Sequence, residues 1–390
     1  YAELIIHGTQ ITLTYPPIGG FFVFLCLYLF FNILLRTLYR PLALSPRELV
    51  VVFTMLVMAS GIASIDLAQR LIPMIAGPFY YATPENHYSL FLLPHIPDWM
   101  APRDPRIITG LFESWHLDTP WRDWLVPLGA WSAFTLATYV LMICVLTIFR
   151  RQWIERERLL FPLVAVPLEV IAPTPRGRLL NDFFRNPYMW IGLLLTMGLH
   201  SYNALNAYYP SLPVMRIMEI GGVPVPTGPW GKPWSAIGTM RFQIQPLIIG
   251  LSYLLTREIS FSLWACYWLG RLEAVIGNAL GLDGLTIAAG GDSFPFPGLQ
   301  TGGAYLALAA VSIWIARRPL LDILSSGLTL RQRPEDSGEP ISYRAAVWGG
   351  LLSFAFLLWW CGRAGMPLHV AAVLMLVAFG YLLAMTRLVA

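Results

Sequence analysis

The sequence predicts an all-α protein, a polytopic bundle of transmembrane helices with about nine spans, some of them short or broken. Two observations predict this class. Hydrophobic residues make up 56% of the 390 residues and charged residues only 12%, whereas charged residues are about a quarter of a soluble domain. Apolar runs of near-spanning length also recur along the whole chain, and outer loops rich in proline, glycine and tryptophan separate several of them.

The apolar runs define the expected spans. A spanning helix needs about 20 mainly apolar residues, because about 30 Å of hydrocarbon must be covered at a rise of 1.5 Å per residue. The runs that meet or approach this length are 18–38, 49–65, 124–149, 190–208, 259–280, 345–360 and 368–385. Two further runs, 242–255 and 302–315, offer about 14 residues each, which is about 21 Å of helix and too short to cross without extension.

The arginines indicate the orientation, because positively charged loops stay on the cytoplasmic side. Placing Tyr1 on the outer side puts most arginines inside, including Arg150, Arg151, Arg156 and Arg158. The first residue is not a methionine and the chain stops directly after an apolar run. We therefore expect a single membrane domain, 1–390, that is truncated at both ends.

Four segments interrupt the spans. Residues 77–124 are rich in Pro, Trp, Asp and His, and we expect an outer cap loop there; 209–240, rich in Pro and Gly, is expected to be an outer loop. Residues 317–344 are expected to form a cytoplasmic loop. The stretch 277–303 is rich in glycine, and we expect either a broken or re-entrant segment beside a cavity or a plain outer loop.

Polar residues inside the expected spans are the candidates for function, because a buried charge costs about 2.5 to 3.5 kcal/mol on insertion scales. Arg271 and Glu273 lie in the run 259–280, and Asn278 shares a helical face with Arg271. An interhelical salt bridge and a substrate or ion site both explain them. His200, Asn203 and Asn206 recur every three residues, which predicts one polar stripe used for interhelical hydrogen bonds or for a ligand.

Composition and motifs exclude several classes. Arginines are spread over the loops and Lys232 is the single lysine, so we expect no nucleic-acid partner. His87 and His95 match no zinc spacing, and the four cysteines lie in apolar runs without a metal or redox pair, so we expect no metal and no cofactor. The sequence has no phosphate-binding lysine loop, nucleophile elbow or zinc-protease helix, which argues against an enzyme.

One segment resembles a known family. Residues 150–162 read Arg-Arg-Gln-Trp-Ile-Glu-Arg-Glu-Arg-Leu-Leu-Phe-Pro. This resembles a family of large, uncharacterised bacterial membrane proteins, a domain of unknown function, which is itself similar to the oligopeptide transporter superfamily. There a Glu-x-Leu-x-Phe/Tyr-Pro element follows a transmembrane helix. The segments 44–49, 82–86 and 298–308 also match, so the resemblance covers most of the chain.

The resemblance implies a bacterial inner-membrane protein that transports a small organic or peptide-like solute, driven by an ion gradient. The partners would be the lipid bilayer and the solute, with a homo-oligomer or a larger membrane complex left open. We expect Arg271 to attract a substrate carboxylate. The expected substrate-binding residues are His200, Asn203, Asn206, Arg271 and Asn278, and the expected ion-coupling residues are Glu273 and Asp283.

Two alternatives from other classes remain. The chain could be a non-transporting structural or accessory subunit of a larger membrane complex, which its 15 tryptophans and 31 prolines favour. It could also be a membrane-embedded transferase with an outer-face site built from Glu85, Asp98, Glu113 or Asp118.

Overall fold

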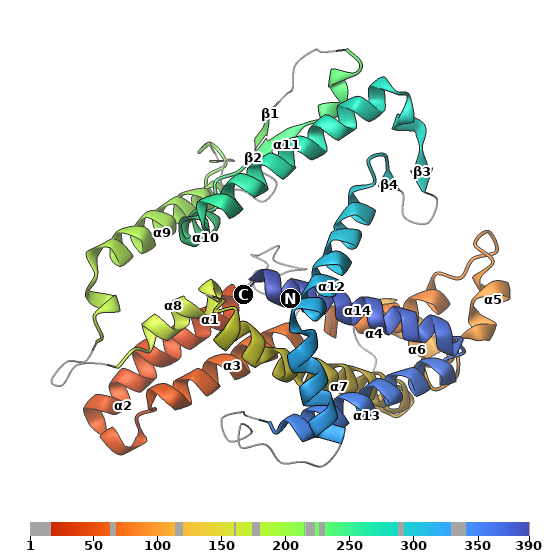
Figure 1. The fold of residues 1–390 in the computed structure, drawn as a ribbon, viewed down its shortest axis with the longest axis horizontal. Coiled ribbons are helices and arrows are strands. Elements are labelled where there is room, and N and C mark those ends of the chain that lie inside the picture. The colour runs from red at the N-terminus through yellow and green to blue at the C-terminus, as the bar shows by residue number, and fades with distance from the viewer. Residues whose placement is uncertain are drawn as a thin grey trace. The chain divides into compact units, whose positions relative to one another are not determined.

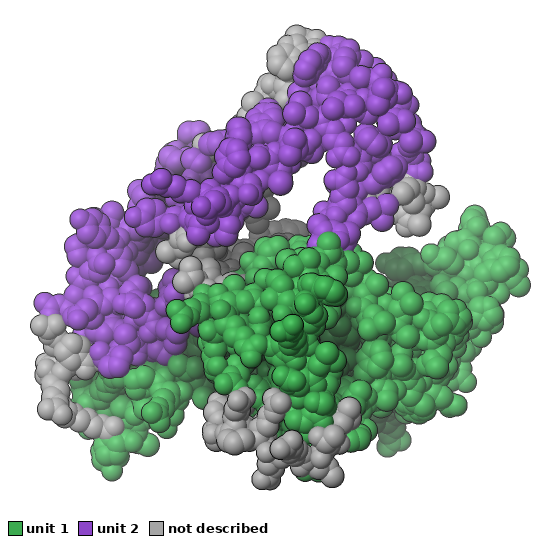
Figure 2. All heavy atoms as spheres, viewed as in Figure 1, with its two compact units in different colours: residues 1–163, 305–390 green, residues 164–304 purple. Residues whose placement is uncertain are grey.

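The chain folds into two compact units, residues 1–163 with 305–390 and residues 164–304, which Figure 2 colours separately. A computed structural model describes residues 17–62, 68–113, 120–159, 161–173, 180–213, 215, 223–225, 231–287, 292–328 and 341–389. The all-α prediction is confirmed, because the strands among the described residues form only two short antiparallel pairs (Figure 1).

Five of the described helices are long and apolar enough to cross a membrane. They cover Gly19–Leu38, Trp121–Arg156, Pro297–Gly327, Tyr343–Arg363 and Leu368–Val389. The chain is therefore an integral membrane protein. The further expected spans 49–65, 190–208, 242–255 and 259–280 are not among the five.

The first unit holds the helices at both ends of the chain. Its elements are α1 (Ile18–Cys26), the π-helix η1 (Leu27–Asn32), α2 (Ile33–Leu38), η2 (Arg40–Leu42), α3 (Pro46–Ile62), α4 (Ala68–Tyr80), α5 (Tyr88–Phe91), η3 (Leu93–His95), α6 (Pro105–Glu113), α7 (Trp121–Arg151), the π-helix η4 (Gln152–Arg156), α13 (Tyr343–Arg363) and α14 (Leu368–Val389). Two more helices, α8 (Pro162–Val170) and α12 (Pro297–Leu328), run across a boundary between the units.

The packing of α13 against α7 forms the core of this unit. Leu141 of α7 and Leu357 of α13 are buried in one cluster with Ala371 and Met375 of α14. The two helices approach closely at Gly349, because glycine has no side chain there. An added Cβ would lie 3.1 Å from the Cys144 sulfur. Small residues at a crossing let helix backbones come together where lipid supplies no hydrophobic driving force.

The first two long helices form a hairpin held by one buried amide. Asn32 is 1% exposed, its Oδ1 accepts from the backbone N–H of Leu44 at 2.8 Å, and its Nδ2 donates to the Leu44 carbonyl at 3.4 Å. This fixes the connection between α2 and α3. On the same hairpin, the rings of Phe24 in α1 and Phe53 in α3 pack with centroids 5.1 Å apart.

The run 302–315, expected to be too short to cross the membrane, is part of a longer helix. Helix α12 extends from Pro297 to Leu328 and has 32 residues. Arg317 ended the apolar run in the sequence, but its Nη1 donates to the Trp314 carbonyl at 2.9 Å and its guanidinium lies 4.3 Å from the Trp314 ring centroid. The helix therefore continues through a charge that is satisfied locally, and its residues 317–328 are not part of a loop.

The second unit contains η5 (Phe183–Arg185), α9 (Pro187–Tyr208), β1 (Val223–Val225), η7 (Trp234–Ile237), β2 (Met240–Phe242), α10 (Pro246–Leu254), α11 (Arg257–Ala279), η8 (Leu282–Gly284), β3 (Thr286–Ile287) and β4 (Asp292–Ser293). Strand β1 pairs with β2 so that Val223 lies opposite Phe242, and β3 pairs with β4 so that Thr286 lies opposite Ser293.

The glycine-rich stretch is more helical than expected. Helix α11 continues to Ala279 and α12 begins at Pro297, so the non-helical connection is shorter than 277–303 and carries the hairpin of β3 and β4. The ring of Phe294 packs on Gly277, where an added Cβ would lie 2.0 Å from the Cε1 atom of the ring. Glycine is required there because the aromatic ring occupies the space of a side chain.

Candidate functional site

The predicted charged residues of α11 lie in its C-terminal half. The helix begins at a Thr256 cap, whose Oγ1 accepts from the Ile259 N–H at 3.4 Å. Half-buried Arg271 donates from Nη1 to the Ile237 carbonyl at 2.7 Å, and its guanidinium carbon lies 5.2 Å from the Tyr267 ring centroid. Among the described residues, no carboxylate forms an ion pair with Arg271. The guanidinium is held in place by neutral groups and keeps further N–H donors.

The carbonyl that accepts from Arg271 belongs to Ile237 and lies at a turn. Residue Ile237 ends η7, which packs against α11, and Gly238 follows with a φ of 70°, in the left-handed region that favours glycine. The chain turns away directly after the carbonyl, so the Ile237 oxygen is left facing the arginine.

Glu273 is also held by a neutral partner. The Nε2 atom of Gln300, in the first turn of α12, donates to Oε1 and Oε2 of Glu273 at 2.9 Å each and to the Pro295 carbonyl at 2.9 Å. Within the described part of the chain, Glu273 has no cationic partner. Neither the Arg271 salt bridge nor the Glu273 salt bridge expected as one alternative is present among these residues.

The polar stripe on α9 serves the loop that follows it. Asn203 accepts from the Met215 N–H at 3.0 Å and donates to the Met215 carbonyl at 3.3 Å, while Asn206 donates to the Leu212 carbonyl at 2.7 Å. Each side-chain amide hydrogen-bonds backbone groups of an irregular segment that lack partners within a helix or sheet. These bonds explain the polar side chains without a ligand. His200 lies one turn earlier and is exposed.

The seven predicted site residues therefore lie in separate local environments. Arg271 faces η7, Glu273 faces the start of α12, and the α9 amides face their own loop. Asn278 is half-buried near the end of α11, and Asp283 lies in η8 with its side chain outside the described part of the chain.

A site that the sequence did not indicate lies in the first unit, at the end of α7. The carboxylate of Glu157 accepts from Arg387 of α14 at 2.9 Å, and the two side chains are only 15% and 18% exposed. Arg387 also donates to the Ser312 hydroxyl of α12 at 3.0 Å, and Gln152 donates to Glu157 at 3.0 Å. This Glu157 network joins three apolar helices through one ion pair.

The sequence around Glu157 produces the turn that buries it. Helix α7 passes into the π-helix η4, and the N–H groups of Glu157 and Leu159 donate to the carbonyls of Gln152 and Trp153 at 2.9 and 3.0 Å. Arg158 and Phe161 then adopt positive φ of 54° and 45°. Helix α8 begins at the residue after Phe161, Pro162. This is the Glu-x-Leu-x-Phe-Pro element of the resemblance.

Two other segments of the resemblance are local structural devices. Ser45 and Glu48 form a reciprocal cap at the start of α3, with the Ser45 N–H 2.7 Å from Glu48 Oε2 and the Glu48 N–H 3.4 Å from Ser45 Oγ. In the segment 82–86, Asn86 Oδ1 accepts from the Thr83 N–H at 3.0 Å and its Nδ2 donates to the Tyr81 carbonyl at 2.6 Å. In both segments these hydrogen bonds order a turn.

Asp98 and Glu113, two of the acidic residues considered for a transferase site, have separate local partners. Asp98 forms an ion pair with Arg103, and Glu113 accepts from the Tyr80 hydroxyl at 2.9 Å. That hydrogen bond, with the nearby negative charge, raises the pKa of Tyr80 above its ordinary value of 10.0. Asp118 lies outside the described residues. In the described ranges no group of three or more His, Cys, Asp or Glu side chains is placed to hold a metal ion.

One comparison with known proteins gives a match. A model of a protein family of unknown function, DUF6785, matches residues 1–390. The chain belongs to the DUF6785 family. No curated protein and no solved structure matches it. The expected membership of an uncharacterised family is thereby confirmed, whereas nothing links this DUF6785 chain to oligopeptide transporters.

Proposed function

We propose that this DUF6785 chain is a secondary transporter of a small organic or peptide-like solute with an anionic group, driven by an ion gradient. The observation that carries the proposal is the state of Arg271. Its guanidinium is half-buried on α11 and fixed by one carbonyl and one aromatic ring, without a carboxylate among the described residues. A charge kept without a counter-ion in a membrane protein is a strong candidate for recognising an opposite charge.

The chemistry of the substrate follows from the donors that remain. A guanidinium offers five N–H donors in a planar fork, and a carboxylate accepts two of them at once. Only one bond from Arg271, to Ile237, is used within the described part of the chain. A carboxylate of an organic acid or a peptide C-terminus matches the rest.

Glu273 supplies the coupling group of this proposal. Its two oxygens accept from the neutral amide of Gln300, so a proton or a sodium ion at the carboxylate would compete with that single amide. Binding of the ion would loosen the link between α11 and the start of α12. In transporters with interrupted helices, coupling-ion sites lie at such helix ends.

We further propose that the chain crosses the membrane about nine times in a bacterial inner membrane, with Tyr1 outside. The helices α3, α9 and α11, of 17, 22 and 23 residues, would supply crossings beyond the five longest apolar helices, and α10, with 9 residues, a partial one.

Thiol labelling tests whether water reaches Arg271. In a cysteine-free background, Ala274→Cys lies three residues after Arg271 on the same face of α11, and Leu263→Cys, at an exposed position, is the matched control. A membrane-impermeant maleimide is expected to label position 274 quickly and position 263 slowly. Protection of both positions would mean that water does not reach Arg271, and would favour the structural-subunit function instead.

Transport is measured on the full chain in proteoliposomes. Charge movement on a solid-supported membrane is recorded after rapid addition of succinate, L-glutamate or dialanine under an imposed proton gradient. We expect a current with at least one anion. Arg271→Gln should abolish it, and Arg257→Gln, in the first turn of the same helix, should keep it. Equal currents from both variants would refute the role of Arg271. A wild type that shows neither a current nor gradient-driven uptake of the radiolabelled solutes would refute coupled transport of these solutes.

A further inference from the structure

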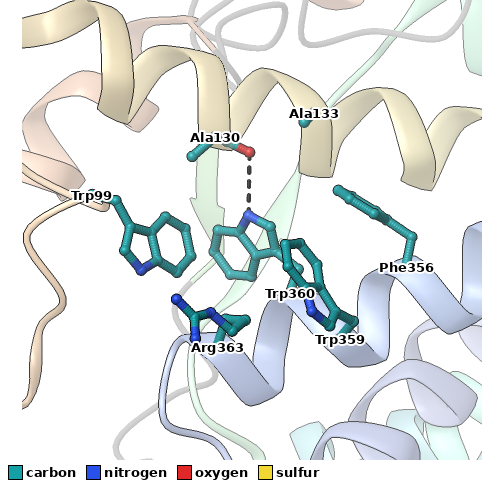
Figure 3. A pocket seen from close by; sticks show the side chains of 7 residues that line it. All are labelled: Trp99, Ala130, Ala133, Phe356, Trp359, Trp360 and Arg363. Carbon is teal, nitrogen blue, oxygen red and sulfur yellow. Dashed lines mark hydrogen bonds between the residues drawn. The ribbon is translucent and has the colours of Figure 1, made fainter.

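An aromatic cavity lies in the first unit beside the ends of two spanning helices. Its volume is about 460 Å³, within the range of small-molecule sites. The residues lining it are Trp99, Ala130, Ala133, Phe356, Trp359, Trp360 and Arg363. Figure 3 shows the indole and phenyl rings around the opening, with the alanines of α7 forming one wall.

The indole N–H groups of this region fall into two classes. Trp360 donates to the Ala130 carbonyl at 3.2 Å, and Trp131, directly beside it, donates to the Met100 carbonyl at 3.1 Å. These two rings are 5.0 Å apart and belong to the structural wall. Trp99 and Trp359 also line the cavity, but their N–H groups donate no hydrogen bond to any described residue. Two indole donors are therefore not used by the described residues.

Arg363 adds a positive charge to the same cavity. It lies in the last turn of α13, and its guanidinium points toward the Trp99 indole in Figure 3. Among the described residues it forms neither a hydrogen bond nor an ion pair. No carboxylate belongs to the cavity lining. The polar side-chain groups of the lining are therefore donors, and their net charge is positive.

A neighbouring cavity shows that this pattern is specific. It has a volume of about 620 Å³, shares Trp99, and is lined by charges of both signs. Its Asp98 and Arg103 neutralise each other as an ion pair. The aromatic cavity has no such compensation for Arg363.

We propose that the aromatic cavity binds an amphipathic anion. The apolar body would lie against Phe356, Trp359 and Trp360, and a carboxylate or phosphate would bind Arg363. Aromatic rings contribute large apolar area, and a charge-assisted hydrogen bond to a guanidinium is about twice as strong as a neutral one. A membrane phospholipid and a soluble organic acid share this chemistry. The proposal does not depend on Arg271 or on transport.

The soluble arm of the test uses 4-phenylbutyrate, with uncharged 4-phenylbutanol as the matched ligand. Binding to the full chain in phosphatidylcholine nanodiscs is measured by equilibrium dialysis. We expect saturable binding of the acid, with affinity at least about tenfold above the alcohol. Arg363→Gln should lower the affinity for the acid about tenfold, and Arg344→Gln, in the first turn of the same helix, should leave it unchanged.

The lipid arm uses native mass spectrometry with phosphatidylglycerol and phosphatidylcholine. Retention of phosphatidylglycerol that Arg363→Gln removes would identify a lipid as the occupant, whereas binding of the acid alone would identify a soluble ligand. Trp359→Leu changes a side chain that is 57% exposed, so it should fold and still weaken binding severalfold. Tryptophans that only anchor the protein at the membrane surface would give no saturable binding in either arm, and that result, or equal binding by Arg363→Gln, would overturn the proposal.

Discussion

The ion pair between Glu157 and Arg387 should be one of the strongest polar contributions to stability in the first unit. Replacing Glu157 with glutamine keeps the size of the side chain and removes its charge. Arg387 would then remain 18% exposed with only neutral partners, the Ser312 hydroxyl and the new amide. Removing one member of a buried pair costs about 3 to 5 kcal/mol.

The expected cost here is somewhat smaller. The side chains are partly accessible and the glutamine retains a hydrogen bond to Arg387, so we expect Glu157→Gln to lower the free energy of unfolding by about 2 to 3 kcal/mol. The same segment provides a control. Glu155, two residues earlier, pairs with Arg151 at 2.8 Å, but its side chain is 56% exposed. Exposed pairs of this spacing contribute about 0.3 to 0.5 kcal/mol, which is the expected effect of Glu155→Gln.

The assay is equilibrium unfolding of the purified chain in mixed detergent micelles, followed by circular dichroism as the fraction of denaturing detergent rises. Arg387→Gln and the double variant complete a thermodynamic cycle, and we expect a coupling free energy of about 1 to 2 kcal/mol. The reasoning would be refuted if Glu157→Gln cost no more than Glu155→Gln, or if the effects of the two single variants were additive.

Two further predictions concern local packing and pH. Gly277→Ala places a Cβ 2.0 Å from the Phe294 ring, so the connection between α11 and α12 should shift and proteinase K, a protease of broad specificity, should cleave it faster. Gly270→Ala, with nothing within 4 Å of its Cβ, should leave the cleavage rate unchanged. Hydrogen bonds from its own backbone N–H and from Thr83 lower the pKa of Glu85 below its ordinary value of 4.5. The stabilisation is therefore complete above the unfolded pKa and lost as pH falls through the folded pKa. Protection factors for amide exchange in the turn 82–86, which correct for the intrinsic exchange rate at each pH, should therefore fall at low pH in wild type and lose this dependence in Glu85→Gln.

The spanning helices could be predicted because their signal is local. Each needs only a run of apolar residues, and α7, α13 and α14 follow the expected runs closely. The errors occur where a charge is satisfied within its own helix. Arg317 appeared to end a span, yet a carbonyl three residues earlier in α12 accepts its hydrogen bond. A count of apolar residues cannot register such a bond.

The Glu157 network could not be predicted for a different reason. Its residues come from η4 and the turn after it, from α12 and from α14, which are far apart in the sequence, and no periodic pattern connects them. The sequence does contain a hint of this ion pair. Arg387 is a lone arginine near the end of an apolar helix, and Glu157 lies in the segment 150–162. In the α9 stripe the periodic pattern was visible but did not reveal the partners. Asn203 and Asn206 have helical spacing, yet they bind the backbone of the following loop.

Three arginines on apolar helices differ in how far their hydrogen-bonding capacity is used within the protein. Arg387 is paired with a carboxylate and a hydroxyl, Arg271 with one carbonyl and one ring, and Arg363 with no described hydrogen-bonding or ionic partner. A guanidinium stays charged at any physiological pH, so it cannot relieve an unfavourable site by losing its proton. Hydrogen-bonding capacity that no residue of the chain uses is satisfied by water, lipid or ligand. Arg387 is thus best explained by stability alone, whereas Arg271 and Arg363 are the positions where an external anion would gain the most.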